Sequence, residues 1–146
     1  MRNQFLEAFG VLVGDWQMTL SDAWFLDPPD TVVEGSATVE WLTDGFIMVR
    51  CVLGGESAYD LVIGHSDAQQ SYVALYHDDR GVNRLFHMTF DGTTWNLSRE
   101  DPDFHQRFLS EVRDDAIIGR WEASEDGGAT WRKDYDLTFR RTGAQR

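Results

Sequence analysis

The stretch NRLFHMTFDGTTWNLSRE, residues 83–100, decides the fold of this chain. Apolar and polar residues alternate on both sides of an Asp-Gly pair, and Asp-Gly between alternating segments is a strong signal for a two-residue hairpin turn. Such a turn fixes the register of the two strands. The predicted facing pairs, all on one side of the sheet, are Phe90 with Thr93, Met88 with Trp95, Phe86 with Leu97, and Arg84 with Arg99.

The same period-2 alternation recurs along the rest of the chain, with Gly, Asp, Asn and Pro between the segments. Regularly spaced short strands of this kind are typical of antiparallel sandwiches and barrels. One short amphipathic helix over residues 3–12 precedes them, because Phe5, Leu6, Phe9 and Leu12 follow helical spacing. Strands are expected near 15–25, 31–42, 45–53, 58–65, 71–78, 82–90, 93–99, 104–113, 116–124 and 130–140.

The turns between these segments assign the inner face. We expect a four-residue loop at 66–69, a three-residue loop at 79–81 and a two-residue turn at 114–115. The strand at 45–53 stays ambiguous, because Arg50 and Cys51 fall on opposite faces and a one-residue slip exchanges them. The inner face then carries Val33, Gly35, Ala37, Val39, Trp41, Tyr59, Leu61, Ile63, Tyr72, Ala74, Tyr76, Phe108, Ser110, Val112, Ile117, Gly119 and Trp121.

The closing stretch EDGGATWRKDYDLTFRR, residues 125–141, contains basic and phenolic groups whose direction depends on one loop. A five-residue loop at 125–129 points Lys133 and Tyr135 inward, together with Trp131, and leaves Arg132 in water. A one-residue slip would bury aspartates and arginines and expose apolar residues, so the first register is favoured.

A chain of ten hairpin-linked strands with one apolar side favours a closed up-and-down antiparallel barrel, since closure removes exposed sheet edges. We therefore predict an all-β fold in which residues 1–146 form one domain and the short N-terminal helix plugs one end. A barrel of ten strands encloses more space than its side chains fill, so a ligand cavity is expected.

Composition limits the partners and the location. Thirteen basic against 25 acidic residues give a formal net charge of −12, which disfavours nucleic acid. No apolar run approaches the ~20 residues of a membrane span, and the N-terminus lacks the features of a signal peptide, so a cytoplasmic protein is expected. The single cysteine, Cys51, is interpreted as a buried apolar residue. The sequence leaves the choice between monomer and homodimer open.

The segment LVGDW, the ten-strand meander and the closing DGGATWRKDYDLTFRR together resemble the calycin superfamily, in particular small bacterial lipocalin-like or fatty-acid-binding-protein-like domains of unknown function. The resemblance covers nearly the whole chain and implies a small barrel around a hydrophobic ligand. Fatty-acid-binding proteins hold a carboxylate with an Arg-x-Tyr pair in the last strand, and the similar element here is Lys133-x-Tyr135. Their helical lid after the first strand is replaced here by FLDPPD.

Three cations are predicted on the inner face: the Arg84 and Arg99 pair, and Lys133. Like charges opposite one another and buried cations without partners are unfavourable, so an anion is expected beside them, with Tyr76 donating its hydroxyl to the same anion. In the alternative interpretation both arginines lie at the rim with their heads in water, and Asp78 forms an ordinary salt bridge with Arg84.

The leading hypothesis is intracellular binding of a small hydrophobic, anionic ligand, such as a fatty acid or an aromatic acid. One alternative is an isomerase, cyclase or hydrolase in which Tyr76 or Tyr135 acts as a general acid beside a cation that lowers its pKa. The predicted ligand-binding residues are Arg84, Arg99, Lys133, Tyr135, Tyr76, Tyr72, Tyr59, Phe86, Met88, Trp95, Phe108 and Trp121.

A second alternative is a haem or gas-sensing module. The haem-binding members of the resembling group use a histidine in the C-terminal strands, but no histidine follows His105 in this chain. Haem would therefore need His65, His77 or His87. No pair of histidines shows the spacing of a metal site, and neither a metal nor a cofactor is expected.

Overall fold

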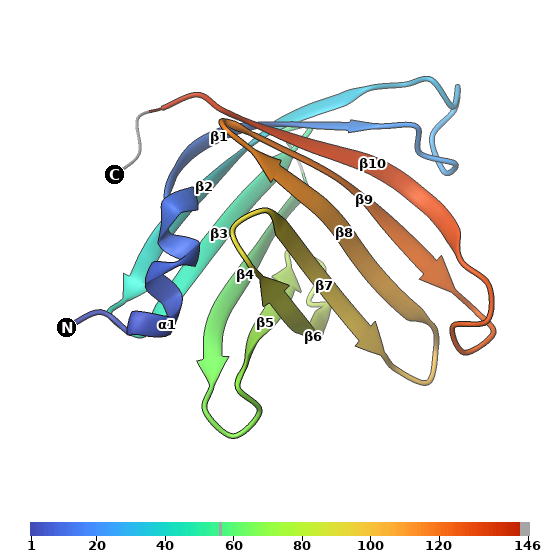
Figure 1. Cartoon of the computed structure of the whole chain (residues 1–146). Coiled ribbons are helices and arrows are strands. Elements are labelled where there is room, and N and C mark those ends of the chain that lie inside the picture. Colours follow the sequence, from blue (N-terminus) through green and yellow to red (C-terminus); the bar gives the residue numbers. More distant parts are fainter. Residues whose placement is uncertain (56, 144–146) are drawn as a thin grey trace.

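The computed structural model describes residues 1–55 and 57–143, and it shows a closed antiparallel barrel with a short helical segment at its N-terminus (Figure 1). The predicted fold class is confirmed. The ten strands are β1 (Gly14–Ser21), β2 (Val33–Thr43), β3 (Phe46–Leu53), β4 (Ser57–Ser66), β5 (Ser71–Asp78), β6 (Asn83–Phe90), β7 (Thr94–Glu100), β8 (His105–Arg113), β9 (Ala116–Ser124) and β10 (Arg132–Arg141).

The strands form a meander, in which each pairs with its neighbours in sequence and β1 pairs with β10 to close the ring. At the closure Met18 lies opposite Phe139 and Leu20 opposite Leu137. All four side chains are buried, so the two ends of the chain contribute to one continuous core. Closure thereby satisfies the backbone groups that an open sheet would expose at its edges.

The β6–β7 hairpin differs from its predicted register by two residues. Phe90 pairs with Trp95 rather than with Thr93, and Met88 pairs with Leu97. The cause is the Asp91 carboxylate, which accepts hydrogen bonds from the backbone N–H groups of Thr93 and Thr94 and so widens the turn. A shift of two preserves the face of every side chain, but it removes the predicted Arg84–Arg99 pair.

The other hairpins follow the prediction more closely. Arg113 pairs with Ala116 across the two-residue turn, as expected. The three-residue loop at 79–81 is also confirmed by the pairing of Tyr76 with Arg84. The expected loop at 66–69 instead occupies 67–70, because Ser66 still pairs within the ladder, and again the faces are unchanged.

A β-bulge in β10 overturns part of the predicted register at the C-terminal strand. Lys133 pairs with Glu122, whereas Tyr135 pairs with Trp121, so one extra residue is inserted between them. Tyr135 and the residues after it keep the predicted inward direction. The prediction that Lys133 faces inward is wrong, because the bulge moves it to the outer face with Glu122.

The remaining ambiguity, in β3, is resolved by burial. Cys51 is 2% exposed and belongs to the core. Arg50 lies on the outer face, where its Nε is 3.0 Å from Glu40 Oε1. The expected extension of the first strand to residue 25 is wrong, since β1 ends at Ser21 and a loop follows.

The predicted helix over 3–12 is two shorter segments, α1 (Gln4–Glu7) and the 3-10 helix η1 (Phe9–Leu12). Asn3 caps α1 by accepting a hydrogen bond from the Phe5 backbone N–H. Leu6, Phe9 and Leu12 are buried in the core, so the segment closes one end of the barrel as expected. Phe5 instead is exposed and stacks on His65 at 4.2 Å between ring centroids.

Among the described residues, no helix combines the length and the apolar character that crossing a membrane would require.

Candidate functional site

A cavity of about 290 Å³ opens at the barrel end opposite the helices. Its lining comes from the last residues of β1, β3 and β5, the first residues of β4, β6, β8 and β10, the later part of β9, and two loops. In Figure 1 this is the end that carries the β1–β2 loop, away from α1. The lining residues are Leu20, Phe25, Leu53, Tyr59, Tyr76, Arg80, Arg84, Phe86, Gln106, Trp121 and Tyr135.

Three tyrosines give the cavity its polar character: Tyr59 and Tyr76 from the neighbouring strands β4 and β5, and Tyr135 from β10. The rings of Tyr59 and Tyr76 lie 5.4 Å apart, and Phe25 meets Tyr135 edge to face at 5.8 Å. Phe86 completes this wall by packing against Tyr76 at 6.5 Å. The alternation of the strands predicted all of these inward directions except that of Phe25, which belongs to a loop.

Burial controls the protonation of the cavity phenols. It raises the pKa of Tyr59 and Tyr135 above the usual range, and burial followed by the hydrogen bond to Asp78 raises the pKa of Tyr76 to about 12. Burial also raises the pKa of the Cys51 thiol to about 12. The cavity therefore presents neutral hydroxyl groups at neutral pH. The hypothesis of a general acid required the opposite shift, a phenol pKa lowered by a neighbouring cation.

Asp78 is the hydrogen-bonding centre of the cavity rim. Its side chain is 4% exposed and accepts hydrogen bonds from the Tyr76 hydroxyl at 2.8 Å and from Arg80 Nη2 at 2.6 Å. The backbone N–H groups of Arg80 and Val82 donate to its other oxygen. The hydrogen bonds from Arg80 hold the pKa of Asp78 well below its usual range. Asp78 thus neutralises Arg80, and the expected rim salt bridge with Arg84 does not form.

Arg84 is the cavity cation that lacks a carboxylate partner within the part of the chain that the structure describes. Its Nη1 donates to Gln106 Oε1 at 3.2 Å, and its Cζ lies 5.3 Å from the centre of the Phe104 ring. A neutral amide and an aromatic ring orient the guanidinium without cancelling its charge. Because the side chain is only half-buried, the remaining donors stay available to a ligand in the cavity.

Arg99 lies outside the cavity and is already neutralised. Its side chain is 4% exposed, with Nε 2.9 Å from Asp101 Oδ2 and Nη2 2.5 Å from Asp103 Oδ1. Its Cζ stacks on the same Phe104 ring as Arg84, at 4.7 Å. The two arginines therefore flank one ring instead of facing each other across a hairpin, and only Arg84 reaches the cavity lining.

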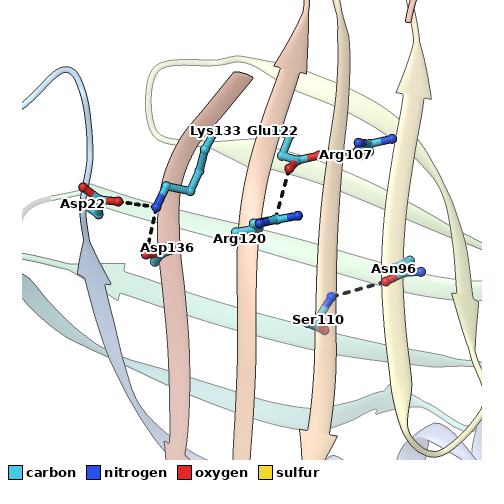
Figure 2. Close-up of polar contacts among 8 residues, drawn as sticks. All are labelled: Asp22, Asn96, Arg107, Ser110, Arg120, Glu122, Lys133 and Asp136. Carbon is cyan, nitrogen blue, oxygen red and sulfur yellow. Dashed lines mark hydrogen bonds and ion pairs between the residues drawn. The ribbon is translucent and has the colours of Figure 1, made fainter. Parts of the chain in front are cut away.

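Lys133 is held on the outer face by two carboxylates. Figure 2 shows its Nζ between Asp22 and Asp136, and the contact with Asp136 is 3.2 Å. Hydrogen bonding to Asp22 raises the pKa of Lys133. The lysine therefore joins the β1–β2 loop to β10 and does not reach the cavity. Only the Tyr135 half of the element that resembles the fatty-acid-binding pair lines the site.

The remaining predicted ligand residues divide between the cavity and the packed end of the barrel. Phe86 and Trp121 line the cavity. Met88, Trp95 and Phe108 are almost fully buried among other core side chains. Tyr72 lies near α1, where its hydroxyl donates to the Phe5 carbonyl at 2.5 Å. The structure thus brings together six of the predicted residues: Arg84, Tyr135, Tyr76, Tyr59, Phe86 and Trp121.

A vestibule of about 290 Å³ continues the cavity outward and shares Phe25, Arg80, Arg84 and Gln106 with it. Trp24 lies at its edge, 58% exposed, where the indole N–H donates to Asp134 Oδ1 at 3.0 Å. Arg132 stacks over the Trp24 ring at 4.6 Å. Arg132 is exposed to solvent, as expected, and it also borders the vestibule.

Sequence reasoning missed Gln106, Phe25, Arg80 and the vestibule residues. Strand alternation could have identified Gln106, because it lies two residues from Phe108 on β8 and therefore on the same inner face. Its side chain is uncharged, so it was not included among the predicted anion-binding residues. No periodic signal marks Phe25 and Trp24, since loop residues have none. Arg80 occupies a turn, and only the folded hairpin carries it over the cavity.

A second and larger depression lies on the outer face of β7–β10, with a volume of about 560 Å³. It is open to solvent, and its lining combines Leu109 and Ile118 with polar and charged side chains such as Glu111, Arg120 and Asp136. Figure 2 shows this face, where Asn96 Oδ1 accepts the backbone N–H of Ser110 and the Glu122 carboxylate pairs with Arg120. Its charges are mutually paired, so we place the candidate site inside the barrel.

The histidines lie outside the cavity lining. His77 is 3.8 Å from Asp60 on the outer face, and His65 at the helix end stacks on Phe5 and meets Tyr72 edge to face. His87 is exposed, and His105 lies near Gly128 in the β9–β10 loop. Among the described residues, no group of three His, Cys, Asp or Glu side chains is arranged to hold a metal ion.

Comparison with known proteins identifies the fold. The crystal structure of Rv2717c from M. tuberculosis matches with a TM-score of 0.63 at 9% identity, over 97% of this chain and 99% of that chain. A de novo designed fluorescence-activating β-barrel matches with a TM-score of 0.39 at 16% identity, over 90% of this chain and 94% of that chain, and a score this low supports no conclusion. No protein-family model and no curated protein matches the sequence. The similarity to Rv2717c shows a shared fold, which in this chain is a closed, ten-stranded antiparallel barrel.

Proposed function

We propose that the barrel binds a small hydrophobic molecule with an anionic end, such as a fatty acid or an aromatic acid, inside the cell. The observation that carries the proposal is Arg84, a half-buried cation on an aromatic cavity that forms no ion pair with any described carboxylate. A partly desolvated guanidinium gains most from a carboxylate or a phosphate, which its planar fork can bind with two hydrogen bonds.

The division of charge around the rim supports an anionic ligand. Arg80 is matched by Asp78 and Arg99 by two aspartates, so these arginines need no further anion. Arg84 has no such carboxylate among the described residues and donates its hydrogen bond to the neutral amide oxygen of Gln106. A ligand carboxylate beside Arg84 would complete the charge balance of the rim, while its apolar part would contact Phe86 and the tyrosines.

The wider assignment follows from the same features. We propose that residues 1–146 form one domain of the calycin type, because all described strands belong to a single barrel and the resemblance spans nearly the whole chain. The cavity volume lies at the lower end of ordinary ligand pockets, roughly 300–1,000 Å³, which favours a small ligand.

Two measurements test this function. Native mass spectrometry of freshly purified protein would detect a retained acid. Titration calorimetry with matched pairs, benzoate against benzyl alcohol and decanoate against decanol, would measure selectivity for the anion. We expect at least one acid to bind more tightly than its alcohol, whereas equal affinity within both pairs would contradict the proposal.

The variant Arg84→Met isolates the contribution of the anchor. We expect the Kd for the acid to rise about 10-fold to 100-fold, the loss of a charged hydrogen bond, while the Kd for the alcohol stays within a few-fold. Arg113→Met is the matched control, because Arg113 pairs with Glu111 on the exposed outer face. An unchanged Kd for the acid in Arg84→Met would show that Arg84 is part of the rim structure and does not bind the ligand.

A further inference from the structure

The floor of the cavity is closed by interlocked aromatic rings. Trp121 lies 5.5 Å from Phe86 and 5.2 Å from Phe108, measured between ring centroids. Phe86 and Phe108 are 2% and 1% exposed. Farther toward the helices, Met88 and Leu97 are fully packed. An occupant therefore cannot extend deeper into the barrel, and a long chain would have to leave through the vestibule.

The cavity walls favour a flat, rigid occupant. Phe25 meets Tyr135 at an interplanar angle of 87°, and Tyr76 meets Phe86 at 75°. Aromatic rings arranged edge to face in this way provide surfaces against which a further ring can pack. A ring also loses less conformational freedom on binding than an alkyl chain, so it binds more favourably in a space of this size.

One phenol in the cavity has an unused hydrogen-bonding group. Tyr76 donates to Asp78, and Tyr59 lies opposite Cys51 on the neighbouring strand. Tyr135 makes no hydrogen bond with any described residue, and its partly buried ring lines the cavity. A hydroxyl that faces the cavity without a protein partner is available to exchange a hydrogen bond with a polar atom of the ligand.

From these observations we infer that the cavity is selective for a compact hydroxylated aromatic carboxylate over a fatty acid. The carboxylate binds Arg84 and Gln106, the ring packs against Phe86 and Trp121, and the ring hydroxyl exchanges a hydrogen bond with Tyr135. This inference rests on the proposed function and narrows the class of its ligand. The preference for a hydroxylated aromatic acid follows from the closed floor of the cavity and from the free Tyr135 hydroxyl. Both observations are independent of the charge of Arg84.

Titration calorimetry with sodium 4-hydroxybenzoate, benzoate and decanoate tests the inference at one pH. We expect 4-hydroxybenzoate to bind about fivefold more tightly than benzoate, the value of one ordinary hydrogen bond, and both to bind more tightly than decanoate. Decanoate binding more tightly than the two aromatic acids would overturn the inference and leave the proposed function intact. Absence of binding by all three acids would overturn both.

The variant Tyr135→Phe tests the hydroxyl contact separately. It should bring the affinities of 4-hydroxybenzoate and benzoate to within about twofold of each other. Tyr72→Phe is the matched control, because it removes a phenol hydroxyl at the opposite end of the barrel, and it should preserve the fivefold ratio. Since the readout is a ratio of affinities in one protein, altered stability does not affect it. A fivefold ratio that persists in Tyr135→Phe would overturn the assigned contact.

Discussion

The two ends of this barrel are built from similar residues and have different properties. At the helix end, Phe9 packs edge to face with Phe90 and Trp95, at 5.1 and 5.4 Å, and the N-terminal segment fills the opening. At the other end, the tyrosines and Arg84 surround a cavity of about 290 Å³ that no segment within residues 1–55 and 57–143 fills. Aromatic content therefore does not separate core from site. What separates them is whether a further piece of chain occupies the space between the rings.

The largest expected effect comes from removing the plug. Phe9→Ala deletes a side chain that is 0% exposed and should lower the free energy of unfolding by about 3–5 kcal/mol, through lost burial and the resulting void. Urea denaturation measures it. Phe25→Ala at the cavity end is the matched control and should change stability by roughly 0.5 kcal/mol or less, since Phe25 is 50% exposed. Equal losses in both variants would refute the distinction between the ends.

The next effect concerns the wall between the two ends. A Cβ at Gly119 would lie 2.6 Å from the Phe108 ring and 2.9 Å from Ser110 Cβ, so Gly119→Ala forces the ring to move. We expect a loss of about 1–3 kcal/mol in the free energy of unfolding. Gly45→Ala is the control, because its new Cβ would meet only the Thr43 hydroxyl, at 3.8 Å. An unchanged free energy of unfolding in Gly119→Ala would mean that the cavity floor around Phe108 is loosely packed.

A smaller effect should separate the two arginines beside Phe104. Arg99→Met leaves Asp101 and Asp103 without their cation and should lower the free energy of unfolding by about 1–2 kcal/mol. Arg84→Met removes a cation that has no carboxylate partner among the described residues. It should therefore be neutral or slightly stabilising, as is common for residues kept for binding. Thermal denaturation of the two variants measures which one loses more stability. A larger loss of stability in Arg84→Met than in Arg99→Met would contradict this distinction between the two arginines.

The pH dependence of stability should reflect Asp78 at the cavity end. Its folded-state pKa is lowered, so its contribution is complete above its ordinary unfolded pKa, near 4, and is lost as pH falls toward the folded pKa. Urea denaturation between pH 6 and pH 2.5 should show a steeper acid loss for the wild type than for Asp78→Asn. Parallel curves would show that the Asp78 hydrogen bonds contribute no pH-dependent stability.

The sequence was sufficient for the architecture and for much of the cavity lining. Strand alternation placed Tyr59, Tyr76, Phe86 and Tyr135 inward, and a register error of two residues at Asp91 changed none of these directions. The ion-pair partners of the charged residues were less predictable from the sequence. Arg84 and Arg99 have the same inward parity, yet two aspartates in the β7–β8 loop neutralise only one of them.

The sequence by itself determined the all-β class, the number of strands, the closure implied by a meander with one apolar side, and the inner parity of the aromatic residues, because all of these depend on local alternation and turns. Only the tertiary structure decided which end is filled, that the bulge turns Lys133 outward to Asp22 and Asp136, and that Phe25 borders the cavity. These features depend on contacts between residues far apart in the chain, and the period of a strand carries no information about such contacts.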